Sequence, residues 1–265
     1  MMFRIMSLTA RRPWLVALIT MVVLFATTYI HNLLALLSAY SELHRTAAFY
    51  YVESIDRSLE IALCVLAVWL MRRAGLRDVI RELGLSAPIL PAFAFATGVP
   101  LPMLIGFALT RSLNPHLQPL PVLFLTIFSP FVEELESRGF GVRQLQRATG
   151  WPFWVVVWPS VVLFGLSHVE QGENLPEMWG LFFLTASGGL LFAWLIYRWQ
   201  NLWFPLALHI CMNLWWELFS VSRNAIGGWF PFALQGLTIL LAILVTLYYR
   251  RAKASPQLQP LEGRT

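Results

Sequence analysis

A short run of ionisable residues, FVEELESRGF at 131–140, interrupts an apolar segment near the middle of the chain. Charged groups at membrane depth are costly unless they are paired or hydrated, so such residues indicate a functional site. On a helix, Glu134 and Arg138 lie four positions apart and are predicted to form an ion pair. Glu133 is rotated away from Arg138. The spacing therefore predicts one paired carboxylate and one that is free to act as a base, although charges at the cytoplasmic end of a helix would give a similar pattern.

Two further polar blocks lie downstream. His168 ends one apolar segment, while His209 and Asn213 share a helix face inside another. Taken alone, each block is typical of a polar clasp between membrane helices. Together with Glu133 they supply a base for water, donors for an oxyanion and a proton carrier, which are the groups that peptide hydrolysis requires. Glu133, His168 and His209 also match a known catalytic zinc set, and the spacing does not choose between these two mechanisms.

The composition is that of a membrane protein. Of the 265 residues, 58% are hydrophobic and 12% charged, whereas a soluble domain has about 25% charged residues. We predict an all-α polytopic transmembrane bundle of about eight spans, forming a single domain over 1–251 with its catalytic core at about 120–220. The predicted spans are 13–37, 55–71, 89–110, 120–142, 151–168, 178–197, 202–219 and 229–249.

The basic residues indicate the orientation of these spans. Arginines gather in the loops after the second, fourth, sixth and eighth spans, and the loop after the fifth span carries only acidic charges. The positive-inside rule therefore places both termini in the cytoplasm. We expect an amphipathic helix on the membrane surface within 76–88 and a disordered cytoplasmic tail at 252–265. The composition is rich in Arg and nearly free of Lys, which favours a multi-pass protein of a bacterial inner membrane; no nucleic-acid partner is expected.

Three motifs on successive helices resemble those of the CPBP family, the CAAX protease and bacteriocin-processing family of intramembrane proteases: EExxxR at 133–138, FxxxH at 164–168 and HxxxN at 209–213. The resemblance covers the fourth to seventh spans and implies one catalytic site formed by Glu133, Glu134, Arg138, His168, His209 and Asn213. It implies that Glu133 activates water while His209 and Asn213 stabilise the oxyanion. Family members are often described as metalloproteases, but for those like the Rce1 prenyl endopeptidases a glutamate-type mechanism is better supported. Zinc, held by Glu133, His168 and His209, is therefore expected only if the mechanism depends on a metal.

The chain departs from the family pattern at Glu136 and Ser137, where apolar residues are usual. The predicted function is nevertheless an intramembrane endopeptidase that cleaves a peptide bond of a membrane-associated peptide or protein near the cytoplasmic side of the lipid bilayer. A prenylated CAAX tail, a bacteriocin or pheromone precursor and a C-terminal sorting anchor are all compatible substrates.

Other functions fit less well. A non-proteolytic scaffold or immunity-type protein could retain the site as a polar clasp, and a proton-coupled transporter could use Glu133 and the histidines as a relay. A serine protease pairing Ser167 with His209 would leave the EExxxR motif unused. The chain has no HExxH motif, which argues against a zinc protease of the site-2 type.

Overall fold

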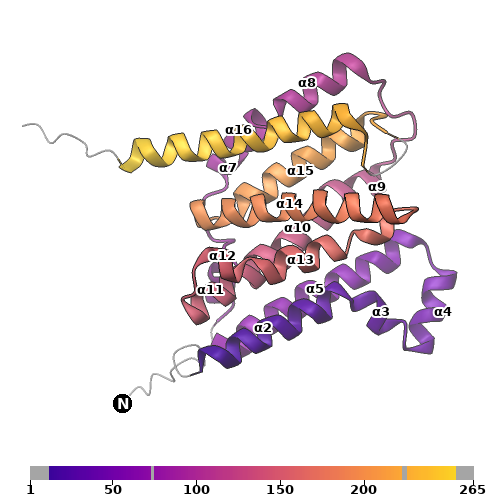
Figure 1. Cartoon of the computed structure of the whole chain (residues 1–265). Coiled ribbons are helices and arrows are strands. Elements are labelled where there is room, and N and C mark those ends of the chain that lie inside the picture. The colour runs from indigo at the N-terminus through magenta and orange to yellow at the C-terminus, as the bar shows by residue number, and fades with distance from the viewer. Residues whose placement is uncertain (1–11, 73–74, 223–225, 255–265) are drawn as a thin grey trace, which may run out of the picture.

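The structure is a computed structural model that describes residues 12–72, 75–222 and 226–254. Within these ranges the regular secondary structure is helical, and the helices lie side by side in one bundle (Figure 1). Helices α2 (Pro13–Thr28) and α5 (Phe49–Arg72) form one edge of the bundle, and α16 (Trp229–Ala254) lies at the opposite edge. The predicted all-α polytopic bundle is confirmed.

The remaining elements complete the bundle in chain order: α3 (Ile30–Leu34), α4 (Ser38–Thr46), α6 (Leu76–Glu82), α7 (Leu90–Gly98), α8 (Leu101–Thr110), α9 (Pro119–Leu123), η1 (Phe124–Phe128), α10 (Ser129–Glu134), η2 (Leu135–Val142), α11 (Arg143–Thr149), α12 (Phe153–Val156), α13 (Trp158–Leu166), η3 (Val169–Gln171), α14 (Leu175–Trp199) and α15 (Trp203–Leu218).

All eight predicted spans coincide with helical segments. In the described part of the chain, four segments are long and apolar enough to cross a membrane: Leu90–Thr110, Phe153–Gln171, Leu175–Trp199 and Trp229–Tyr249. The first span is represented by α2, a shorter apolar helix, and α5 carries charges along its length. The number of crossings therefore stays a prediction. The start of α2 and the end of α16 lie at the same end of the bundle (Figure 1). Of the predicted disordered tail at 252–265, residues 252–254 belong to α16 instead, and the rest lies outside the described residues.

The predicted surface helix at 76–88 is present as α6, but its apolar face packs into the bundle. Val79 and Leu83 are each 1% exposed, so this face contacts protein. Glu82 joins the helix to its neighbours, with its Oε2 atom 3.1 Å from Arg72 Nη2 and 2.5 Å from Arg147 Nη1. Burial and the nearby Arg147 lower the pKa of Arg143 to about 10, against the attraction of Glu82.

Candidate active site

An irregular helix presents the two glutamates. The chain from η1 through η2 runs as one helix in which α-helical and wider π-helical turns alternate, a feature frequent at functional sites. In η1 the Ser129 amide donates to Phe124 O, five residues back. The next carbonyl in this pattern, Leu125 O, would need the amide of Pro130, which has no N–H. Asn213 Nδ2 supplies the missing donor at 3.0 Å and so joins α15 to this helix.

Glu134 lies at the centre of a buried polar group. Its side chain is 0% exposed, and its Oε1 atom is 3.2 Å from Arg138 Nη1 and 2.9 Å from His209 Nδ1. The predicted ion pair between Glu134 and Arg138 is confirmed. The Arg138 guanidinium lies 4.2 Å from the centre of the Phe164 ring, and Gly189 on α14 leaves the space that it fills, because a Cβ there would lie 2.9 Å from Arg138 Nη2.

The contact with Glu134 orients His209. Arg138 keeps Glu134 an acceptor, so the Nδ1 atom of His209 must carry the proton that it shares with Glu134. The opposite ring nitrogen, Nε2, then faces Glu133, with 3.9 Å between Nε2 and Glu133 Oε2. Stacking of the imidazole on Phe192, with ring centroids 5.0 Å apart, holds the plane of the ring. A buried carboxylate that fixes the tautomer of a histidine is a common device for proton transfer.

Glu133 is the more accessible of the two carboxylates. Its side chain is 13% exposed, and its Oε1 atom accepts a hydrogen bond of 2.8 Å from Ser129 Oγ. Arg57 Nη2, on α5, lies 3.8 Å from the same oxygen. Within the described residues, Glu133 Oε2 accepts no hydrogen bond. This oxygen lies 3.9 Å from His209 Nε2. The two carboxylates therefore differ in the way the spacing predicted: Glu134 is held in an ion pair with Arg138, while one oxygen of Glu133 accepts no hydrogen bond.

His168 approaches the site from the end of α13. Its Nδ1 atom lies 2.8 Å from Phe164 O, four residues earlier, and 3.1 Å from Ser167 Oγ. Because the carbonyl only accepts, Nδ1 carries the proton and Nε2 is the nitrogen left for chemistry. The helix α13 begins only at Trp158, with Pro159 in its first turn. Helix α13 is about two and a half turns long, and His168 follows two residues after its end, at the last position of the predicted span 151–168.

Most of these side chains face one cavity of about 710 Å³. Its lining includes Glu133, His168, His209 and Asn213, while Glu134 and Arg138 lie behind its wall. The cavity lining extends to His31 on α3, Gln171 in η3 and Glu217 near the end of α15. Helix α3 lies at the end of the bundle opposite to the start of α2 and the end of α16 (Figure 1). The arginine-rich connections do not line the cavity.

Glu136 and Ser137, the two departures from the family pattern, are buried in the wall. Glu136 is 7% exposed and accepts a hydrogen bond of 2.6 Å from Thr27 Oγ1 on α2. The backbone carbonyl of Ser137 accepts from Ser160 Oγ at 2.9 Å. Glu136 therefore joins α2 to the helix that carries Glu133 and Glu134.

Arg57 and Glu60 are site residues that the motifs did not indicate. Arg57 Nη1 lies 3.1 Å from Glu60 Oε2, so the guanidinium bridges this carboxylate and Glu133. Both residues sit inside the second predicted span, where ionisable groups are costly. The rule that singled out Glu133 therefore also applies to them and would have found them.

The donor types of Glu133, His168 and His209 suit zinc, since each imidazole keeps its Nε2 atom free. The spacing is looser. Two ligands about 2.0–2.1 Å from a tetrahedral zinc ion lie about 3.4 Å apart, whereas His209 Nε2 and Glu133 Oε2 are 3.9 Å apart. Zinc held by these three residues would act as a Lewis acid, and the side chains would need to close around it.

The fold and site define a helical membrane protein with a buried carboxylate–imidazole centre. Residues 115–215 match the family described as Type II CAAX prenyl endopeptidase Rce1-like. This match, over 101 of the 265 residues, supports the resemblance to CAAX-type intramembrane proteases that the three motifs indicated. Comparison with curated proteins and with solved structures gives no match.

Proposed function

We propose that the chain hydrolyses peptide bonds of membrane-associated substrates, with Glu133 as the base that activates water. The observation that carries this proposal is the path from Glu134 through His209 to Glu133. The 0% exposed Glu134 carboxylate binds one nitrogen of His209 and leaves the other 3.9 Å from Glu133, inside a cavity large enough for a peptide segment. A polar clasp would leave no such space beside the carboxylate.

The proposed steps of peptide hydrolysis use side-chain atoms that are not already held in hydrogen bonds. A water molecule between Glu133 and the substrate carbonyl would give a proton to the carboxylate as its oxygen attacks the carbonyl carbon. The second amide hydrogen of Asn213, the first being held by Leu125 O, and Nε2–H of a protonated His209 would donate to the oxyanion. Collapse of the intermediate would break the C–N bond, and Glu133 would return its proton to the leaving amine. His168, through its Nε2 atom, would orient the water.

Purified protein in detergent would test this function with a fluorogenic library of membrane peptides, in the presence and absence of a chelator. Cleavage that survives chelation supports the glutamate-type mechanism, and cleavage lost on chelation and restored by zinc supports the metal-dependent one. If neither the parent nor the zinc-supplemented protein cuts peptides that it demonstrably binds, the protein acts as a scaffold and the proposal fails.

Arg57 is proposed to hold the Glu133 carboxylate in position. Replacing it in Arg57→Gln should lower kcat about tenfold, equivalent to about 1.4 kcal/mol of transition-state stabilisation, with little change in KM. The double variant Arg57→Gln/Glu60→Gln avoids leaving Glu60, 4% exposed, unpaired. Arg57→Lys should recover part of the rate because it keeps the charge. Exposed Arg45→Gln is the matched control, and equal kcat values for Arg57→Gln and Arg45→Gln would refute the assignment.

The position of the cavity bears on the side at which cleavage occurs. If the arginine-rich connections face the cytoplasm, the cavity opens toward the opposite face, which differs from the cytoplasmic-side cleavage expected from the sequence. We infer that an inner-membrane protein of this orientation would cut exported precursors or sorting anchors rather than prenylated cytoplasmic tails.

Thiol labelling measures this orientation directly. In intact cells, a membrane-impermeant thiol reagent should label Ser41→Cys, an exposed site on α4, and should not label Arg77→Cys, an exposed site on α6. The parent, with Cys64 buried and Cys211 half-buried, provides the background. The opposite labelling pattern would restore the cytoplasmic side.

A further inference from the structure

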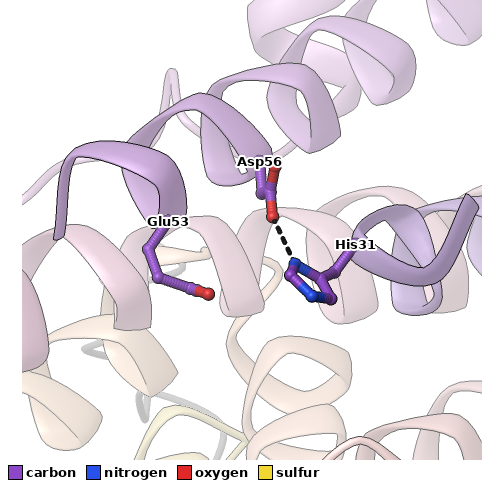
Figure 2. Close-up of side chains that lie close together, drawn as sticks. All are labelled: His31, Glu53 and Asp56. Carbon is purple, nitrogen blue, oxygen red and sulfur yellow. Dashed lines mark hydrogen bonds and ion pairs between the residues drawn. The ribbon is translucent and has the colours of Figure 1, made fainter. Parts of the chain in front are cut away.

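A second cluster of metal-compatible side chains lies at the mouth of the cavity, outside the segment that matches the family. His31 on α3 and Glu53 and Asp56 on α5 each offer one ligand atom, and these atoms lie within 4.8 Å of one another. Figure 2 shows the three side chains turned toward a common space, with the contact between His31 and Asp56 marked. All three line the cavity.

The spacing of one pair already suits a metal ion. His31 Nδ1 and Asp56 Oδ2 are 3.2 Å apart. Two ligands bound to tetrahedral zinc at about 2.0–2.1 Å lie about 3.4 Å from each other. His31 and Asp56 would therefore need little movement to share one ion, and Glu53, one helical turn before Asp56, would close the third position.

An unsatisfied buried carboxylate oxygen independently points to a ligand. Asp56 is 2% exposed, yet its Oδ1 atom has no hydrogen-bond partner. Glu53 makes no hydrogen bond or ion pair within the described residues, so two neighbouring carboxylates are left without a fixed cation. A buried acceptor without a partner costs about 1–3 kcal/mol, and more when it is charged. A cation that Asp56 holds through both of its carboxylate oxygens would remove this cost.

Tyr40 supports the cluster from α4. Its hydroxyl donates to Asp56 Oδ2 at 2.5 Å and lies 2.9 Å from His31 Nδ1. The hydrogen bond to Asp56 is of the kind that orients metal-ligating carboxylates, whereas any proton on His31 Nδ1 must leave before this nitrogen binds an ion. The side chains are thus held in place by contacts that do not use Asp56 Oδ1 or Glu53.

We propose that His31, Glu53 and Asp56 bind a divalent transition-metal ion, such as Zn²⁺ or Mn²⁺, at the mouth of the cavity. One imidazole and two carboxylates suit these borderline ions better than Ca²⁺ or Mg²⁺, which favour oxygen ligands alone. Three protein ligands leave further coordination positions to water. The ion would join α3 to α5 and is separate from the Glu133 site, so the proposal stands independently of proteolysis.

The test uses the full chain in detergent, stripped with chelator, re-equilibrated with Zn²⁺ and desalted. Bound metal is counted by mass spectrometry, and the melting temperature is recorded with and without Zn²⁺. The parent should retain one equivalent of zinc after desalting, and Glu53→Gln should lose it. The variant should bind zinc at least tenfold more weakly and show a smaller zinc-induced rise in melting temperature. Because Glu53 makes no hydrogen bond or ion pair within the described part of the chain, its replacement should leave the metal-free protein folded.

Two control variants locate the ion. Glu42→Gln, on exposed α4, and Glu133→Gln should each retain the equivalent, and Tyr40→Phe should weaken binding by about 10–100-fold. The proposal is overturned if Glu53→Gln and Asp56→Asn bind Zn²⁺ as the parent does. It is also overturned if the parent retains no metal, or if Glu133→Gln loses the ion while Glu53→Gln keeps it.

Discussion

Glu133→Gln is expected to lower kcat at least 10²–10⁴-fold, the range typical of losing a general base, while the affinity for substrate changes little. The amide cannot accept a proton from water, but it keeps the size of the carboxylate and can still accept the hydrogen bond from Ser129 Oγ. Single-turnover kinetics with a cleavable membrane peptide would give the rate, and fluorescence anisotropy with the same peptide would give Kd.

A matched carboxylate isolates the effect. Glu170 is exposed and lines the same cavity, and within the described part of the chain it forms no hydrogen bond or ion pair with the candidate catalytic residues. Glu170→Gln should therefore cleave within about twofold of the parent. Equal rates for Glu133→Gln and the parent would remove Glu133 as the base and would revive the hypothesis that Ser167 is the nucleophile.

Glu134→Ala is expected to destabilise the bundle by about 3–5 kcal/mol, because it leaves the Arg138 charge buried without its partner. The Arg138 side chain is 1% exposed. The same change frees His209 Nδ1, so any folded fraction should also lose activity. Chemical denaturation in detergent, followed by tryptophan fluorescence, measures the stability.

The chain offers a surface pair for comparison. Glu42 and Arg45 form an ion pair at 2.8 Å with side chains 58% and 74% exposed. Exposed pairs contribute about 0–1 kcal/mol, so Glu42→Ala should have little effect on unfolding. If Glu134→Ala unfolds at the same denaturant concentration as Glu42→Ala, the buried pair does not stabilise the bundle as argued.

Local spacing predicted the parts of the site that lie within one helix. The ion pair of Glu134 and Arg138 joins positions four apart, and such neighbours meet in almost any helical packing. The helical segments were likewise predictable, because apolar runs of about 20 residues are a strong signal. Pro130, just before this motif, lacks the N–H that would bond a backbone carbonyl one turn earlier, and this signal could also have been read from the sequence.

Residue spacing within a motif could not predict the contacts between helices that are distant in sequence. His209 bonds to Glu134 across 75 positions, and Asn213 donates to the Leu125 carbonyl across 88 positions; nothing in either motif specifies these partners. The family resemblance implies that Asn213 stabilises the oxyanion, whereas in the structure one of its two amide hydrogens is donated to the backbone carbonyl of Leu125. Which end of the bundle the cavity opens to depends on the packing of α2, α5 and α13, which periodicity does not encode.

The central claim, that Glu133 drives peptide hydrolysis in a membrane, is tested most directly without knowing the substrate. Membranes would be prepared from otherwise identical cells that produce equal amounts of folded parent or Glu133→Gln, and all peptide termini would be compared by mass spectrometry. We predict a set of new termini in membrane-associated proteins that is present with the parent and absent with the variant. Identical termini in the two membranes would contradict the account.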